Sequence, residues 1–185
     1  MATVVAELIL FRLRVAQNEG GDIDQILALA NLDLERLLQP DARIDVSEEI
    51  RVWDAIAEHM NRDDIGLVCG ANFPNQVASM VGYVMLNAPT LKVAVERVCA
   101  YQKLMGDSMG LIIHDENTRC RVGVELWSPW YSSLKYTIDI TISAVVHWAR
   151  NNTFDKVEPL AVGFHYERPP DIKPYKNMFY RGILG

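Results

Sequence analysis

Residues Arg119–Trp127 read Arg-Cys-Arg-Val-Gly-Val-Glu-Leu-Trp, and this stretch decides the fold class. Apolar and polar residues alternate along it with the period of a β-strand. One face carries the apolar side chains: Cys120, Val122, Val124 and Leu126. Arg121 and Glu125 fall on the opposite face, so the pattern predicts a strand with one buried face and one face in water.

The neighbouring segments supply the rest of a small sheet. Met109–His114 is a second apolar run and Asp115–Thr118 is a polar turn, so these residues and Arg119–Trp127 predict a β-hairpin. Leu160–Tyr166 alternates again and predicts one more strand. We therefore expect an antiparallel sheet of about three strands.

Two helices flank the hairpin in the sequence. The first has Thr90 as its N-cap and ends at Gly106. The second, Trp130–Arg150, is apolar on more than one side, and such a helix is usually covered twice. The sheet is one cover. The N-terminal helices, a partner subunit or a ligand pocket is the other.

The chain before about Leu86 reads as a series of helices. Met1–Phe11 is predicted to be an amphipathic helix, Asp22 and Ser47 to be N-caps of later helices, and Asp171 to cap a last short one. The expected fold class is therefore α+β. A helical N-terminal subdomain over residues 1–86 precedes an α+β subdomain over residues 87–185, and the two are continuous as one domain.

The composition argues against several classes of protein. Eighteen Lys and Arg residues against 24 Asp and Glu residues give a net charge of −6, whereas chains that grip nucleic acid usually present a basic face. The three cysteines are widely spaced, which is typical of reduced thiols in a cytoplasmic protein. The sequence contains no apolar run of the roughly 20 residues needed to span a bilayer, so we expect no membrane partner.

The sequence shows no catalytic constellation, so we do not expect an enzyme. It has no Gly-x-Ser-x-Gly, no phosphate-binding glycine loop and no His-Glu-x-x-His motif. A metal site would need His114 and His165 to meet across the sheet, with Cys120 as a third ligand. Imidazoles on the outer face of strands are more often solvated, so we predict neither a metal site nor a cofactor.

The most suggestive local feature is the aromatic cluster Trp127, Trp130 and Tyr131 at the turn from strand to helix. Large rings at such a turn can line an apolar ligand pocket, and they can equally pack a sheet on a helix. Tyr101 and Met105, on the preceding helix, lie near the start of the first strand of the hairpin. We predict that these five residues bind a ligand between the Thr90 helix, the Trp130 helix and the sheet.

A series of short motifs then carries a resemblance to a known family. In order along the chain they are Asp64-Ile-Gly-Leu67 with Gly70, Gly82-Tyr83, Asn87-Ala-Pro-Thr-Leu91 with Ala94, Tyr101, Val162-Gly-Phe-His165, Pro169-Pro170 and Tyr175. The series resembles the N-terminal domain, often labelled "arabinose-binding", of AraC/XylS-type bacterial transcription regulators, in the branch with a helical start. The label comes from the founding regulator, whose sugar-binding domain differs in sequence, so it does not imply a sugar here.

The resemblance implies a domain that binds a small-molecule effector, forms a homodimer and controls a DNA-binding domain. Members of the family usually continue past the segment Tyr175–Phe179 into two helix-turn-helix units. No such unit occurs in this sequence, so we expect DNA contact only through a C-terminal domain that this chain lacks. A haem- or gas-sensing module is the alternative interpretation, and a small enzyme is a third.

Overall fold

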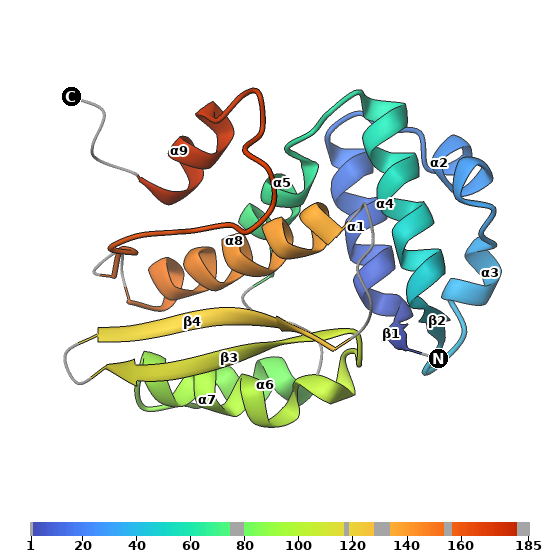
Figure 1. The fold of residues 1–185 in the computed structure, drawn as a ribbon. Helices are drawn as coiled ribbons and strands as arrows, with labels where there is room; N and C mark the ends of the chain where they lie inside the picture. The colour runs from blue at the N-terminus through green and yellow to red at the C-terminus, as the bar shows by residue number, and fades with distance from the viewer. Residues whose placement is uncertain (1, 75–79, 117–118, 128–133, 154–156, 181–185) are drawn as a thin grey trace.

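The N-terminal residues form a helical lobe in the computed structural model, which describes residues 2–74, 80–116, 119–127, 134–153 and 157–180 (Figure 1). We call this part, Thr3–Met60, the N-terminal lobe. Its elements in chain order are β1 (Thr3–Val5), α1 (Ala6–Asn18), α2 (Ile23–Ala30), α3 (Leu34–Leu37), β2 (Arg43–Asp45) and α4 (Val46–Met60). Strands β1 and β2 pair antiparallel, with Val4 opposite Ile44. The prediction of helix from Met1 onward is therefore wrong for Thr3–Val5, because pairing with β2 holds these residues extended.

A closed apolar core holds the N-terminal lobe together. Helices α1, α2 and α4 each turn one face inward, and the side chains of Ile9, Ile26 and Ile56 are completely inaccessible to solvent. Asp22 caps α2 as predicted, since its Oδ1 accepts a hydrogen bond of 3.1 Å from the backbone N–H of Gln25. Burial of this kind stabilises a fold by about 1.5–3 kcal/mol for each large aliphatic side chain.

The N-cap of α4 lies two residues before the predicted one. Asp45, and not Ser47, occupies the position: its carboxylate accepts from the backbone N–H of Ser47 at 2.8 Å. Glu48 returns the bond by accepting from the backbone N–H of Asp45 at 3.0 Å. This capping box satisfies two backbone donors at once, so Asp45 is favoured over Ser47 as the first residue of the cap.

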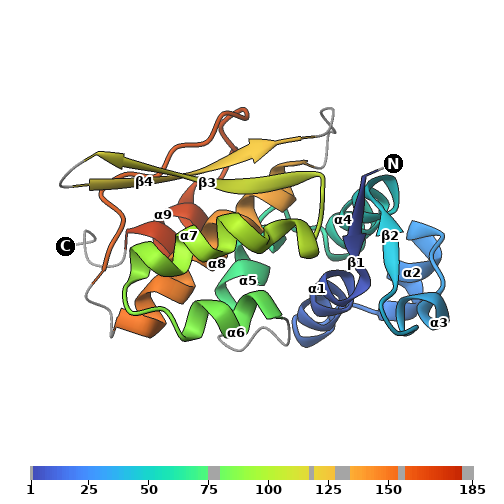
Figure 2. The same cartoon turned by 90° about the horizontal axis from the view of Figure 1, so that it is seen from below.

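The rest of the described chain surrounds one long helix, α8. Its elements are α5 (Ile65–Ala71), α6 (Met80–Leu86), α7 (Leu91–Tyr101), the 3-10 turn η1 (Gln102–Leu104), β3 (Met109–Glu116), β4 (Arg119–Leu126), α8 (Leu134–Thr153) and α9 (Lys173–Phe179). The hairpin β3–β4 lies along one side of both α7 and α8, and α6 packs on α7 (Figures 1 and 2). Helix α9 lies on another side of α8, away from the hairpin (Figure 1). Thr90 caps α7 as predicted, because its Oγ1 accepts from the N–H of Val93 at 3.2 Å.

The hairpin has the predicted register and faces. Val122 and Val124 pair with Ile113 and Leu111, and they are half-buried while Arg121 and Glu125 are exposed. Cys120 is also exposed, contrary to the prediction. It pairs with Asp115 beside the turn, at the end of the hairpin where the alternating face is no longer covered.

The predicted third strand is wrong. Residues 160–166 form no strand in the structure; they run alongside α8 as an irregular segment (Figure 1). The predicted alternation is present from Val162 onward, because Val162, Phe164 and Tyr166 are half-buried while the residues between them are exposed. It is wrong for Leu160, which is 78% exposed. The inward side chains pack on an apolar cluster that includes Phe179 of α9. The sheet therefore has two strands, and the third segment uses helices as its partner.

Helix α8 is covered on two sides, as its two apolar faces predicted. Helix α5 lies against one side so closely that a Cβ on Gly66 would come within 2.7 Å of the carbonyl oxygen of Tyr136, and one on Gly70 within 1.7 Å of Ser143 Oγ. Both glycines are therefore required for this approach. Although α5 and α6 lie within residues 1–86, they pack on α8 and α7 respectively. Within the described residues, no helix is long and apolar enough to cross a membrane.

Candidate functional site

A cavity of about 160 Å³ lies where the N-terminal lobe meets helices α6, α7 and α8. Helix α8 forms one wall, with Ile140, Thr141, Ala144, Val145 and Trp148. The facing wall comes from α6, α7 and β3, through Val81, Met85, Val98 and Leu111. Leu8 and Arg12 of α1 line the cavity from the N-terminal lobe. Elements far apart in the sequence, from α1 to α8, thus converge on one apolar space, which is the usual character of a small-molecule site.

Arg12 is the exceptional residue in this lining, because it is charged and only 3% exposed. Its Nη2 donates to Oε1 of Glu49, itself 4% exposed, at 2.6 Å. The guanidinium carbon lies 4.7 Å from the ring centre of Trp53, a cation–π contact. Within the described part of the chain, Arg12 Nε and Nη1 have no hydrogen-bond partner. A buried group with unused donors is costly, so it marks a place where a bound acceptor would be favoured.

The structure places the five predicted ligand-binding residues in different surroundings. Met105 lines the cavity. Tyr101 is 48% exposed and does not line it. Trp127 also lies away from the cavity: its Nε1 donates to Glu125 at 3.0 Å, and Lys103 Nζ lies 5.3 Å from its ring centre. Trp130 and Tyr131 lie outside the described residues. The structure thus brings Met105 together with α8 residues that the prediction did not include.

Arg12 was missed although the sequence carries a signal for it. Ile9, Arg12, Leu13 and Ala16 have the spacing of one buried helical face, and all four are buried in α1. An arginine inside such a stripe has to find a buried partner. The cavity itself left no local signal, because its walls come from segments far apart in the sequence.

The side of α8 that faces away from the cavity carries a buried polar cluster. Asp139 is 0% exposed and accepts hydrogen bonds from the hydroxyls of Tyr166 and Tyr175, the latter at 2.8 Å. Lys135 Nζ lies 3.4 Å from the same carboxylate. Burial raises the pKa of Asp139, while the bonds from the two tyrosines and the charge of Lys135 oppose that rise. The pKa of Tyr175, on α9, is also raised, chiefly by burial.

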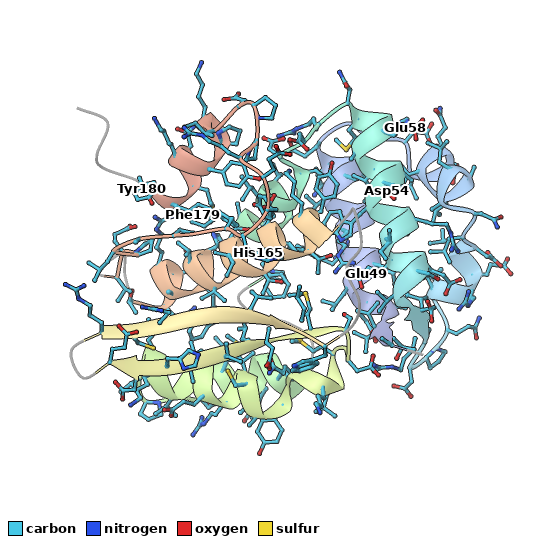
Figure 3. All side chains as sticks on the ribbon, in the orientation of Figure 1. Glu49, Asp54, Glu58, His165, Phe179 and Tyr180 are labelled. Atoms are coloured by element: carbon cyan, nitrogen blue, oxygen red, sulfur yellow. The ribbon has the colours of Figure 1, made fainter. Side chains whose placement is uncertain are left out.

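Arg150, near the C-terminal end of α8, makes a second link to α9. Its side chain is buried, with Nη1 donating to the carbonyl of Met178 at 2.6 Å and Nη2 reaching the carbonyl of Phe179 at 3.5 Å. Its Nε donates to Glu158 at 2.9 Å. Asp139 and Arg150 therefore clamp α9 to α8 at two places. Phe179 and the residue after it, Tyr180, lie at the end of α9 that faces away from the N-terminal lobe (Figure 3).

The histidines and the buried cysteine of the described residues lie outside the cavity. The described residues contain no group of three or more His, Cys, Asp or Glu side chains that could hold a metal ion. His114 and His165 are exposed, and none of the four histidines lines the cavity. Burial raises the pKa of Cys69 to about 12, which keeps this thiol protonated and unreactive near neutral pH.

Comparison with known proteins gives one family. A family model described as the arabinose-binding domain of AraC transcription regulator, N-term, matches residues 20–183. The match spans α2 to α9 and so includes most of the cavity wall. No curated protein matches the chain closely enough to be compared with it.

Proposed function

Since the chain belongs to the family of arabinose-binding, N-terminal domains of AraC transcription regulators, we propose that its cavity binds a small effector whose presence is passed on through α8 to α9. Membership makes the chain an effector-sensing regulatory domain. The proposal adds the place of binding and the route of the signal. It also adds a DNA-binding domain that follows this domain in the complete regulator and receives the signal.

One observation carries the proposal: helix α8 lines the cavity and also makes the polar contacts to α9. Ile140, Ala144 and Trp148 line the cavity from this helix. Asp139 and Arg150 hold α9 from the same helix. A ligand that displaces α8, even slightly, therefore acts on both contacts with α9. Helix α9 follows α8 in the chain and contacts it directly, so we propose it as the element that receives the signal from α8.

The mechanism we propose is a population shift between two arrangements of α8 and α9. An effector moves such an equilibrium only by the difference between its affinities for the two arrangements. Couplings between sites in regulatory proteins are typically about 1–3 kcal/mol, or roughly 5-fold to 150-fold in an equilibrium constant. Loss of one of the charge-assisted hydrogen bonds of Arg150 has a comparable size, about 1.5–3 kcal/mol. Breaking or forming one such contact therefore suffices for the signal.

The proposal includes a homodimer that works in the cytoplasm and meets DNA only through its second domain. The net charge of −6 fits this division of labour, because an acidic domain is repelled by the phosphate backbone. The state of association is checked by sedimentation at several concentrations. A mobility shift with duplex DNA, using this domain alone, should show no binding; a specific shift would contradict the division.

The test of the signal route fills the cavity by mutation and observes α9. Ala144→Phe places a ring in the cavity from α8, and Ala28→Phe places the same ring on the exposed side of α2 as the control. We expect Ala144→Phe to change the amide hydrogen exchange of Tyr175–Phe179 by at least about 5-fold, and Ala28→Phe to leave it unchanged. Equal exchange of α9 in the two variants would contradict the proposed route.

A further inference from the structure

We propose that the effector is a mainly apolar molecule about the size of one aromatic ring, with a neutral oxygen acceptor that Arg12 binds, and that it is not a sugar. This inference rests on the proposed function and names the chemical class of its ligand. Size, polarity and charge each contribute one part of the argument.

The volume limits the ligand to a small molecule. An apolar cavity of roughly 150 Å³ accommodates benzene, and the cavity here is about 160 Å³. Most small-molecule pockets are larger, at about 300–1,000 Å³. A single ring with a short substituent, or an aliphatic chain of equal volume, therefore fits, and a porphyrin does not.

The polarity of the walls disfavours a sugar. Besides Arg12, the lining offers two side chains that form ordinary hydrogen bonds, Thr141 and Trp148. The Thr141 hydroxyl already donates to the carbonyl of Thr137 at 2.7 Å, and the Trp148 indole can offer a single N–H donor. A pentose carries a hydroxyl group on most of its carbons, and each one needs a partner once water is removed. A buried hydroxyl without a partner reduces affinity by roughly 10-fold. Several unmatched hydroxyls would prevent binding.

The unused donors of Arg12 require an acceptor, and the charge balance selects its kind. Nε and Nη1 lack partners within the described residues, so an oxygen atom placed beside them gains a charge-assisted hydrogen bond. The charge of Arg12 is already balanced by Glu49 at 2.6 Å. A carboxylate ligand would put a second negative charge beside Glu49 in a poorly solvated space. A ketone, aldehyde, ester or amide oxygen meets the need without that penalty.

Four probes of similar size separate these requirements by isothermal titration calorimetry on the whole chain. They are acetophenone, which has a neutral carbonyl; ethylbenzene, which has no acceptor; benzoate, which is anionic; and arabinose. We expect acetophenone to bind at least about 10-fold more tightly than ethylbenzene, which is the lower limit of the ratio expected for one hydrogen bond from a charged donor. Benzoate and arabinose should bind more weakly than ethylbenzene.

Two variants test whether Arg12 and the cavity are responsible. The double variant Arg12→Leu/Glu49→Leu removes both charges together, so that neither is left buried alone. It should lower the affinity for acetophenone to that for ethylbenzene and leave the affinity for ethylbenzene unchanged. Ala144→Leu should weaken both, because it occupies the cavity. Circular dichroism of each variant checks that it is folded.

The results separate this inference from the proposed function. Tighter binding of benzoate or arabinose than of acetophenone would overturn the ligand class. So would an equal loss of both aromatic probes in the double variant. If acetophenone binds through Arg12 while the hydrogen exchange of α9 stays the same, the ligand class stands and the signal route fails. If Ala144→Phe alters α9 and no apolar probe binds, the route stands and the ligand class fails.

Discussion

The N-terminal lobe and the layers around α8 bury apolar side chains to different ends. In the lobe, Ile9, Ile26 and Ile56 are completely inaccessible and belong to one continuous core, which extends beyond the lobe to residues of α5 and to Ile140 of α8 at the cavity wall. Around the cavity, the apolar cluster of α6, α7 and β3 has only three buried members, Val81, Val98 and Leu111, among the described residues, and each keeps some exposure. The first region is filled, whereas the second leaves room.

This difference in packing indicates where the domain can accommodate a ligand. A filled core is close-packed and resists any change in volume. A partly filled space accepts a new group without breaking existing contacts. On the proposed function, a ligand would therefore act on the α8 side, against the packed surface of the N-terminal lobe. Each of the following variants tests this contrast.

The largest expected effect comes from shortening side chains in the two regions. Ile56→Ala should lower the free energy of unfolding by about 2–5 kcal/mol, because it opens a cavity in a closed core. Met85→Ala should cost about 1 kcal/mol or less, since Met85 already borders empty space and loses fewer contacts. Urea denaturation measures both. A cost for Met85→Ala equal to that for Ile56→Ala would remove the contrast.

Enlarging a small residue should give the next effect. Ala16→Leu, in the closed core of the lobe, should lower the free energy of unfolding by about 1–3 kcal/mol through overpacking. Ala144→Leu, which points a larger group into the cavity, should change it by less than about 1 kcal/mol. Thermal melts of the two variants compare them directly. A strongly destabilised Ala144→Leu protein would mean that the space by α8 is not available to a guest.

Asp139 tests the clamp between α8 and α9 by its response to pH. Burial raises its folded-state pKa above the ordinary value near 3.8, so the folded state keeps the proton longer than the unfolded state. The contribution of Asp139 to stability is therefore greatest in acid. It falls as the pH rises above the ordinary value near 3.8 and through the raised folded-state pKa. Asp139→Asn should lower the free energy of unfolding by about 1–3 kcal/mol at about pH 4 and by less at about pH 7. Chemical denaturation across this range measures the difference, and a loss that grows with pH would reverse the assigned direction.

The smallest effect concerns helix caps in the two regions. Asp45→Ala removes a capping box from α4, and Thr90→Ala removes a single cap bond from α7. We expect losses in the free energy of unfolding of about 1–2 kcal/mol for Asp45→Ala and about 0.5–1 kcal/mol for Thr90→Ala. Melting temperatures of both variants give the order. Glycine at each position serves as the control, because it removes the cap bond yet is itself a tolerated N-cap residue.

The parts of the fold that were predicted correctly depend on neighbours in sequence. Thr90 caps the helix that follows it, and Val122 and Val124 face inward because alternation is a local property of a strand. The prediction of a strand at residues 160–166 was wrong because a strand also needs a partner strand, and the partner is not a local property of the sequence. Alternation determines which side chains turn inward, but it does not say whether a strand or a helix lies opposite. Here Phe164 packs against Phe179 of α9, with ring centres 5.8 Å apart.

The candidate site could be predicted only in part. The sequence analysis placed the ligand beside the long helix and included Met105, which lines the cavity. It chose the other residues by the size of their rings, whereas the cavity is defined by side chains that stop short of one another, such as Ala144. Empty space between distant segments follows from the packing of the whole fold, so no local pattern reports it. Arg12 is the exception, since a charge within an apolar helical stripe can be recognised in the sequence.

The two links between α8 and α9 have a mechanical consequence. Asp139 and Arg150 are 11 residues apart on one helix, which corresponds to about 16 Å along its axis. A helix held to another by one contact can rotate about that contact. A helix held by two separated contacts follows both the translation and the tilt of the other helix. Helix α9 is held by two contacts, and the residues that make them, Asp139 and Arg150, lie on either side of the cavity-lining stretch Ile140–Trp148 in the sequence. On the proposed signal route, a displacement of α8 would therefore change the orientation of α9 as well as its position.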